Sequence, residues 1–370
     1  MKTIKYTLIL IAFSFLAACS PSSGLTQYRE TTFDVGFNTP FTLVGYTHSE
    51  EEFLEYFEAM KTEIRFYNSQ FDTFKNYEGV NNLKVVNDMA GLEKVSVDPS
   101  IIELLEYSKN NSTSYNELFD PTMGAVLEIW HEYRERGLEL NRENKYGPSP
   151  SQEILEDAAQ YIGWDFVDID SVNNTVYLTN ERVFLDIGAI AKGWAVEKVA
   201  QHLEELGLTS GIVNGGGNIR LIGAKNNTEA WNVGVTNPDS ITNESIASLH
   251  FDQSMSVVTS GDYERFFIDD QGNFQNHLIN PRTLQPARFS RSVTVTVKDS
   301  GLADLLSTVF SMVELEEAKQ IETELNMDDL GIMFIKKTKQ DETHGYHYME
   351  VDNKHIYYND VIKNALDEKK

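Results

Sequence analysis

The chain has a single cysteine, Cys19, and this limits what can hold its fold together. No second thiol follows it, so disulfides, thiolate metal sites and a cysteine nucleophile are excluded from the folded part of the chain. The core must therefore be stabilised by packing alone. With 370 residues, of which 41% are hydrophobic, the chain has enough apolar material for one large domain or two closely packed ones.

The segment before Cys19 has the features of a secretory signal. Lys2 and Lys5 precede an apolar run from Tyr6 to Ala18, which is too short for a comfortable membrane span. The run ends in Leu16-Ala17-Ala18-Cys19, the pattern of a bacterial lipobox, in which the cysteine is acylated.

These features predict three segments. Residues 1–18 are expected to be a signal peptide, residues 19–30 a lipidated tether, and residues 31–370 the functional domain. The protein is therefore expected to be exported and to be anchored through Cys19 to the extracytoplasmic face of the cell membrane.

The formal net charge of the chain is −26 at pH 7. A surface this acidic repels phosphate backbones, so we expect no nucleic-acid partner. A smaller phosphate ligand would need a metal ion or a local basic group.

Helical and strand patterns both occur, which predicts a mixed fold. Apolar residues recur at helical spacing from Phe53 to Tyr67, and again over Ile101–Tyr107 behind Pro99. A buried strand is expected over 183–187, followed by a helix over 189–206 and a strand over 211–214. Strands are also predicted within 31–46 and over 231–236, 256–259, 292–298 and 331–337. We expect an α+β fold with mixed α/β layers.

The segment Leu185–Gly193 places Asp186 at the end of a predicted strand and Lys192 in the first turn of the next helix. Ligands bind at such junctions in α/β units. The spacing matches neither a Walker A loop nor the Rossmann fingerprint. A tight turn with a solvated lysine would have the same residues, so this motif alone leaves both interpretations open.

Asp304, Ser307 and Thr308 fall in a predicted helix. Asp304 and Thr308 are four residues apart and share one helical face, with Ser307 beside them. Such oxygen ligands suit Mg²⁺, which keeps several waters and binds substrate phosphates. The alternative is a first-turn aspartate that interacts favourably with the helix dipole, next to a threonine with a structural hydrogen bond.

Four further segments are candidates for ligand contact. Asp120 starts an Asp-Pro turn, and the glycines Gly215–Gly217 offer bare backbone. Ser260 and Gly261 could present hydroxyl and backbone donors to a phosphate, and His277 precedes a proline turn. Each segment also has a purely structural interpretation, as a turn or as a histidine that forms a hydrogen bond.

Taken in order, these motifs resemble the signatures of the ApbE family of FAD:protein FMN transferases. The resemblance extends from about Thr31 to Leu325 and implies an ApbE-like, T-fold-related architecture. Many members are lipoproteins, which agrees with Cys19. The matching segments are Phe119-Asp120-Pro121-Thr122, Leu185–Gly188, Ala191–Gly193, Gly215–Asn218, Thr259–Asp262, His277–Thr283 and Ala303–Thr308.

The resemblance implies a magnesium site and a FAD site. Mg²⁺ would be held by Asp304, Ser307 and Thr308 and by the backbone carbonyl of Ala189. His277 and Asp304 would be the catalytic residues, with His277, whose ordinary pKa is near neutrality, as a candidate for proton handling. The implied FAD-contacting positions are Phe37, Phe74, Leu118, Phe119, Asp120, Asp186, Lys192, Ser260, Gly261 and His277.

The chain departs from the family pattern at several positions. Asn280 stands where aspartate is usual, and it keeps an acceptor but loses a charge. Leu284 stands where glycine is usual. Residues 37–39 replace a Met-Gly-Thr motif, and residues 72–74 replace a serine-threonine-aromatic triplet, so the departures affect the flavin side of the implied site most.

The resemblance also implies a reaction and its partners. A Thr or Ser hydroxyl of an exported acceptor protein would attack the FMN-side phosphorus of FAD, and AMP would leave, with Mg²⁺ neutralising charge on the pyrophosphate. Two other functions remain open. Water could replace the hydroxyl, which would make the protein a Mg²⁺-dependent FAD pyrophosphatase, or the protein could be a surface lipoprotein that binds flavin without chemistry.

Overall fold

The computed structural model describes residues 24–112, 114–115, 117–240, 242 and 244–366. The predicted signal peptide and Cys19 lie outside the described residues. In the part of the chain that is described, no helix is long and apolar enough to cross a membrane.

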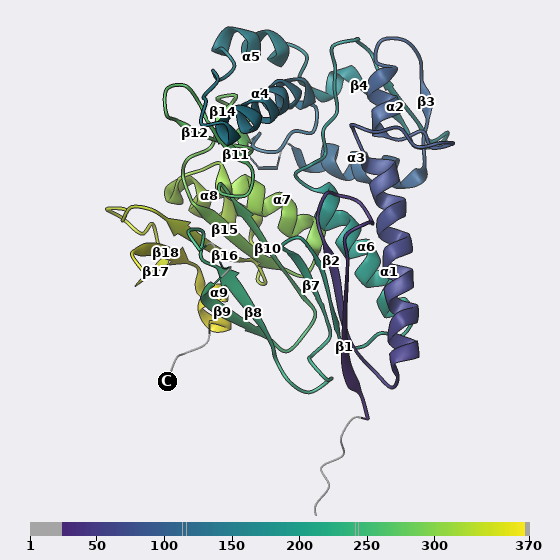
Figure 1. Ribbon diagram of the computed structural model, residues 1–370, viewed down its shortest axis with the longest axis vertical. Coiled ribbons are helices and arrows are strands. Elements are labelled where there is room, and N and C mark those ends of the chain that lie inside the picture. Colours follow the sequence, from purple (N-terminus) through teal and green to yellow (C-terminus); the bar gives the residue numbers. More distant parts are fainter. Residues whose placement is uncertain (1–23, 113, 116, 241, 243, 367–370) are drawn as a thin grey trace, which may run out of the picture.

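A nine-stranded sheet forms the centre of the molecule (Figure 1). Its strand order is β1-β2-β6-β7-β10-β15-β16-β18-β17, and every neighbouring pair is antiparallel. The strands are β1 (Thr26–Thr32), β2 (Phe41–Thr47), β6 (Gly211–Gly215), β7 (Asn218–Ile222), β10 (Met255–Gly261), β15 (Ser292–Val297), β16 (Gly331–Lys336), β17 (His347–Val351) and β18 (Lys354–Tyr358).

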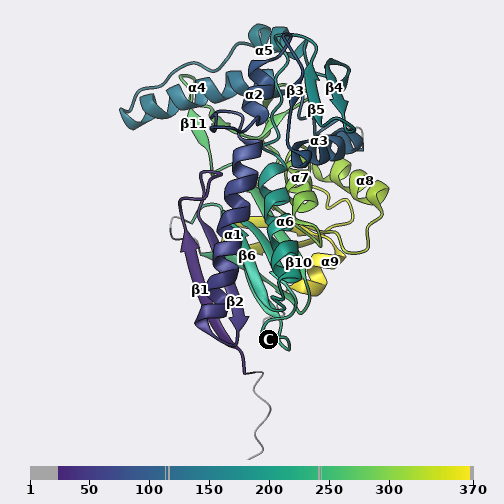
Figure 2. The same ribbon diagram turned by 90° about the vertical axis from the view of Figure 1, so that its right-hand side faces the viewer.

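Helices cover one face of this sheet (Figure 2). They are α1 (Glu50–Phe71), α6 (Ala191–Glu205), α7 (Ser300–Ser311) and α8 (Leu315–Leu325). The hairpin of β8 (Trp231–Thr236) and β9 (Ser245–Phe251), with α9 (Asp360–Ala365), packs on the other face through a separate apolar cluster. Since both faces are covered, all residues of the central strands β15 and β16 are buried.

Local sequence explains where these helices begin. The Ser49 hydroxyl accepts a hydrogen bond from the backbone amide of Glu52 at the start of α1, and the Asp299 carboxylate accepts one from Leu302 at the start of α7. The apolar side chains of α1 that recur at helical spacing face the sheet.

A second group of elements lies above the helical layer in Figure 1. One buried cluster continues from Leu83 and Leu118 in this group into Val293 and Phe334 of the sheet, so the two parts share a core. The group consists of α2 (Leu83–Asp88), β3 (Val95–Ser96), α3 (Pro99–Ser112), α4 (Gly124–Arg142), α5 (Gln152–Ala159), the short 3-10 helix Trp164–Phe166, β4 (Val167–Asp170), β5 (Thr175–Leu178), β11 (Phe266–Ile268), β12 (Phe274–Asn276), β13 (Ile279–Asn280) and β14 (Gln285–Pro286).

The prediction of a mixed α and β fold is confirmed, but two local predictions are wrong. Residues 26–30 belong to β1 and not to the tether predicted over 19–30. Residues 183–187 are not a strand. The side chain of Asn87 bonds both the amide and the carbonyl of Leu185, and the amide of Asp186 bonds the carbonyl of Pro121. These partners satisfy the backbone in place of a neighbouring strand.

Candidate active site

A cleft of about 1100 Å³ lies where the upper group of elements meets α1, α6 and α7. Its walls come from segments far apart in the chain, including the turn before α4, the start of α6, the end of β10 and the exposed side of α7. The predicted site residues that line it are Phe37, Phe74, Leu118, Phe119, Asp120, Asp186, Ala189, Lys192, Ser260, His277, Asp304 and Thr308. Their individual roles stay predictions.

Asp304 is buried where α7 crosses the start of α6. Its Oδ2 accepts a hydrogen bond from the amide of Gly193 at 2.8 Å. A Cβ atom on residue 193 would lie 2.4 Å from the Cβ of Asp304, so only glycine allows the two helices to approach this closely. Burial raises the pKa of the Asp304 carboxyl, and the charge of nearby Lys192 opposes this shift.

The oxygen atoms around Asp304 fit a magnesium ion. Among the described residues no group of three or more His, Cys, Asp or Glu side chains is arranged to hold a metal. A cation here would therefore be held by one carboxylate with hydroxyl and carbonyl oxygens, as expected for Mg²⁺. Thr308 follows Asp304 by one helical turn, and both line the cleft with Ala189. A cation would also compensate the buried charge of Asp304.

Ser307 and Gly261 lie behind the cleft lining, unlike the other predicted contacts. The hydroxyl of Ser307 donates to the carbonyl of Asp304 at 2.9 Å and bonds the hydroxyl of Ser260 at 2.7 Å. It therefore joins α7 to β10 and does not face the cleft. A Cβ atom on residue 261 would lie 2.4 Å from the ring of Tyr263, so Gly261 makes room for that ring.

Asp120 and Asp186 line the cleft, and each side chain accepts hydrogen bonds from the residue two positions later in its own turn. Asp120 Oδ1 accepts from the amide and the hydroxyl of Thr122, at 2.8 and 2.7 Å. Asp186 Oδ1 accepts from the amide of Gly188 at 2.7 Å. Burial raises the pKa of both carboxyls, and these hydrogen bonds oppose the shift. The turn interpretation thus holds for both, while both side chains still line the cleft.

His277 differs electrostatically from what its residue type predicts. Burial, followed by the charges of Arg265 and Arg134, lowers the pKa of His277 to about 3 instead of leaving it near neutrality. The imidazole is therefore neutral at physiological pH. Its Nδ1 atom is buried and has no hydrogen-bond partner among the described residues, so its hydrogen-bonding capacity is unsatisfied.

Two aromatic side chains stand at the predicted flavin side. Phe37 has a left-handed backbone with φ 53°, and its amide donates to Asn68 Oδ1 at 2.7 Å. Phe74 is 60% exposed, and its ring centroid lies 4.9 Å from that of His131. Both rings therefore have free surface in or beside the cleft, although the sequence departs from the family pattern here.

The structure explains the departures at Asn280 and Leu284. Asn280 does not line the cleft; its amide group donates to the carbonyl of Met312 at 2.9 Å, and its Oδ1 accepts from the amide of Arg282. Leu284 has φ 58°, the conformation that glycine adopts most easily. The glycines 215–217 are also outside the cleft lining, and Gly216 makes room for Thr39 instead of a ligand.

The lining residues that the sequence did not predict include three side chains with basic groups: His131 and Arg134 on α4, and Arg265 after β10. The sequence contains only a weak indication of these residues. Basic residues follow the Asp120 turn in a strongly acidic chain, and this alone does not place them in a cleft.

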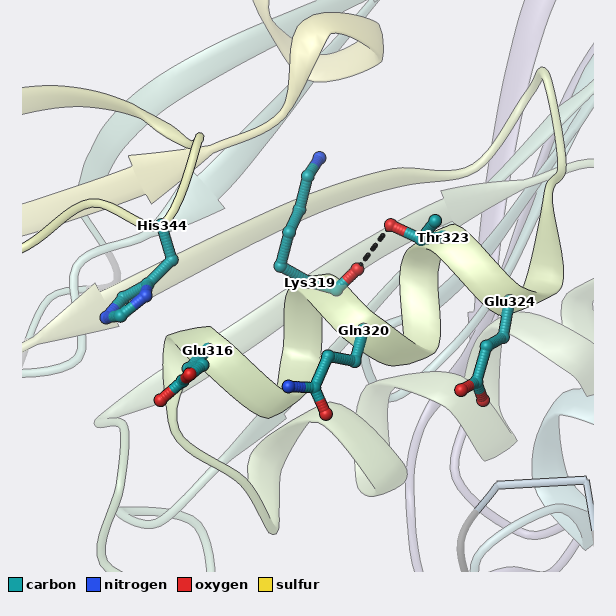
Figure 3. Close-up of a pocket in the computed structure, with 6 residues that line it drawn as sticks. All are labelled: Glu316, Lys319, Gln320, Thr323, Glu324 and His344. Atoms are coloured by element: carbon teal, nitrogen blue, oxygen red, sulfur yellow. Dashed lines mark hydrogen bonds between the residues drawn. The ribbon is translucent and has the colours of Figure 1, made fainter.

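A smaller cavity of about 420 Å³ lies over α8 (Figure 3). Among the residues drawn there, one hydrogen bond is marked: the Thr323 hydroxyl donates to the backbone carbonyl of Lys319, one turn earlier in α8. Lys319 pairs with Glu322 at 3.0 Å. This surface has none of the buried, unpaired groups that distinguish the larger cleft. Its lining residues are Glu316, Lys319, Gln320, Thr323, Glu324 and His344.

A large concave site that collects a buried carboxylate, a lysine, hydroxyls and a neutral histidine with an unsatisfied ring nitrogen is typical of an enzyme active site. The model of the ApbE family matches residues 31–333, and the chain belongs to this family.

Similar proteins agree with this assignment. A protein of Haemophilus influenzae named FAD:protein FMN transferase is 24% identical over 88% of this chain and 92% of its own length. A Rhodobacter capsulatus protein of the same name is 28% identical over 65% of this chain, and the match spans only 43% of that protein.

Solved structures give the same fold. The ApbE protein of Thermotoga maritima superposes with a TM-score of 0.71 and 28% identity, covering 84% of this chain and 94% of that one. Flavin transferase ApbE from Vibrio cholerae superposes with a TM-score of 0.70 at 20% identity, covering 92% of this chain and 100% of that one. The second likeness concerns the fold alone.

Proposed function

We propose that this protein transfers the FMN moiety of FAD to a Thr or Ser hydroxyl of exported acceptor proteins, releases AMP, and requires Mg²⁺. The observation that carries this proposal is the cleft that brings Asp304, Thr308, Lys192 and His277 together in a member of the ApbE family. Relatives named FAD:protein FMN transferase support the same reaction.

The polar groups on the wall formed by α6 and α7 would hold the pyrophosphate. Lys192 supplies a positive charge in the first turn of α6, and none of the described residues forms a hydrogen bond or ion pair with its ammonium group. Asp304, Thr308 and the Ala189 carbonyl would hold Mg²⁺, which when bound neutralises charge on the phosphate oxygens during transfer.

His277 would act on the attacking hydroxyl. Its neutral ring has a buried Nδ1 without a partner among the described residues, which would accept a hydrogen bond from a Thr or Ser hydroxyl that enters the cleft beside it. Burial is the largest cause of the lowered pKa of His277, and the charges of Arg265 and Arg134 lower it further; anionic FAD bound beside these cations would offset their part of the shift. A ring that becomes more basic when substrate is bound suits proton removal.

The lipid anchor and the extracytoplasmic location belong to the same proposal. Cys19 follows the predicted signal, and export of the enzyme would place it on the same side of the membrane as an exported acceptor protein. Fractionation of cells that express wild type or Cys19→Ala is the test. We expect wild type with the membranes and the variant released; membrane retention of Cys19→Ala would contradict the anchor.

Covalent transfer is tested by incubating the protein with FAD, Mg²⁺ and a candidate acceptor, followed by a denaturing gel. We expect flavin fluorescence on the acceptor, abolished by EDTA and by Asp304→Asn. The matched control is Asp270→Asn, which removes one exposed aspartate away from the cleft. Full activity of Asp304→Asn would contradict the metal site. AMP release without acceptor fluorescence would instead indicate a FAD pyrophosphatase.

A further inference from the structure

The cleft contains two arginines, Arg134 and Arg265, whose contacts with a substrate the proposed reaction does not specify. Arg134 projects from α4 and Arg265 follows β10, and both line the cleft on the side of the upper group of elements. Lys192 and Asp304 lie on the other side, on α6 and α7.

Arg134 is a largely but not fully buried cation with few partners. Its side chain is only 15% exposed, and its closest carboxylate oxygen, on Glu135, is 3.9 Å from Nε. The guanidinium forms one hydrogen bond within the described residues, between Nη2 and Nδ1 of His131 at 2.6 Å. Because a guanidinium has five N–H donors, most of its donors have no protein acceptor.

The neighbouring carboxylates that the structure describes do not accept hydrogen bonds from these two arginines. Asp186 bonds the amide of Gly188, and Asp304 bonds the amide of Gly193. Glu264 lies close enough to Arg265 and Lys192 for their charges to lower its pKa, against the larger effect of burial. Nowhere in the described chain does a carboxylate form an ion pair with Arg265, and the contact of Arg134 with Glu135 is at the limit of an ion pair.

We infer that Arg134 and Arg265 form a phosphate-binding subsite that contacts the pyrophosphate of the dinucleotide from the side opposite Asp304. The identity of the dinucleotide rests on the proposed function. Burial of an incompletely paired cation is costly unless an anion joins it, and the planar guanidinium matches phosphate oxygens in a bidentate manner. In a chain with a formal net charge of −26, this cluster is also a local exception that attracts phosphate.

The test compares Arg134→Gln with Arg136→Gln. Both remove one arginine charge from α4, but Arg136 is exposed and does not line the cleft. Titration calorimetry measures the affinity of each variant for ADP without Mg²⁺, after circular dichroism has verified that both are folded. We expect Arg134→Gln to bind ADP about ten- to a hundredfold more weakly than wild type, as for loss of charge-assisted hydrogen bonds, and Arg136→Gln to bind nearly as wild type.

Arg134→Lys provides a further test, because it keeps the charge and removes the fork of donors. An affinity between those of wild type and Arg134→Gln supports bidentate binding. Equal ADP affinity in Arg134→Gln and Arg136→Gln would overturn the inference, and so would a wild-type protein that does not bind ADP.

These outcomes are independent of flavin transfer. If ADP binding depends on Arg134 while no acceptor becomes fluorescent, the proposed function is wrong and the subsite stands. If flavin is transferred but ADP affinity does not depend on Arg134, the subsite is wrong and the function stands. When transfer is active, Arg134→Gln should raise KM for FAD more than it lowers kcat, because the contact is made before and during the reaction.

Discussion

Leu284 shows two opposing effects at a single residue. Its left-handed backbone costs about 1–2 kcal/mol, whereas burial of its side chain beside α4 stabilises the fold by about 1.5–3 kcal/mol. Its carbonyl also accepts the indole N–H of Trp130 at 2.8 Å. The leucine is therefore kept by packing in a position where the backbone favours glycine.

The variants Leu284→Gly and Leu284→Ala separate these two effects. Both lose the buried side chain, but only glycine relieves the backbone. We expect glycine to lower the free energy of unfolding by about 1 kcal/mol and alanine by about 2–3 kcal/mol. Urea denaturation measures the free energies of unfolding of the two variants. An alanine variant more stable than the glycine variant would show that the left-handed backbone carries no cost here.

Tyr77 connects two walls of the cleft by hydrogen bonds. Its hydroxyl donates to Asp72 at 2.9 Å and accepts from Asn68 at 2.8 Å, and Asn68 holds the amide of Phe37. Asp72 in turn accepts from the amide of Phe74. The positions of Phe37 and Phe74 therefore depend on one phenol.

Tyr77→Phe should weaken FAD binding several-fold and cost about 1 kcal/mol of stability, because Asn68 loses a partner. Tyr46→Phe is the matched control: its hydroxyl bonds Gln27 at the sheet edge, outside the cleft. Fluorescence titration of FAD measures both. Equal affinities in the two variants would mean that the phenol does not organise the flavin side.

At the scale of elements, one buried ion pair connects α6, α7 and β7. Glu197 and Arg220 pair at 2.9 Å with side chains 7% and 8% exposed, and Glu197 also accepts from the amide of Ser300 at the start of α7. The helix that positions Asp304 is thus connected to the pair. The position of α7, and with it that of Asp304, therefore depends on a charged residue outside the cleft.

Glu197→Ala should lower the free energy of unfolding by about 3 kcal/mol, since buried Arg220 would keep only the more distant carboxylate of Glu204, at 3.9 Å. The double variant Glu197→Met/Arg220→Met should be clearly more stable than the single variant. Glu229→Gln, in the exposed pair with Lys225, should change stability by less than about 1 kcal/mol. A double variant with the same free energy of unfolding as Glu197→Ala would show that loss of packing, and not the unpaired charge, causes the destabilisation.

The sequence predicts the long amphipathic elements well. Periodicity identifies α1, α3 and the last part of α6, and it places Asp304 and Thr308 on one face of α7. It fails over 183–187, because an apolar run has the same pattern whether a strand or the Asn87 side chain satisfies its backbone. Arg134 was missed for a related reason: its place in the cleft depends on tertiary packing of α4 and not on local spacing.

For the molecule as a whole, acid stability depends in part on one turn. Asp269 lies between β11 and β12 and is 2% exposed. Burial raises its pKa, but hydrogen bonds from Gln275, Asn273 and Ser149 outweigh burial and lower the pKa to about 2. The folded pKa is below the unfolded value of about 3.9, so this carboxylate stabilises the fold above that pH and the contribution is lost as the pH falls towards 2.

Asp269→Asn should therefore reduce the fall in stability between about pH 4 and pH 2, by an amount on the order of 2 kcal/mol. Asp270→Asn, at the neighbouring exposed position, should have the same dependence of stability on pH as wild type. Urea midpoints at several pH values provide the measurement. Parallel profiles for Asp269→Asn and wild type would exclude this aspartate as a source of acid sensitivity.

If the proposed function holds, the length of α1 has a consequence for which acceptor proteins could be modified. Its 22 residues span about 33 Å, from beside Thr47, which pairs with Thr26 at the start of β1, to Phe71, which lines the cleft. Figures 1 and 2 place the start of β1 at the end of the molecule away from α4 and α5. If Cys19 carries a lipid, the seven residue-to-residue steps from Cys19 to Thr26 reach at most about 25 Å. With α1 upright on the bilayer, the cleft would lie at the end of α1 away from the anchor, so a membrane-bound acceptor would have to present its hydroxyl tens of ångströms above the lipid surface.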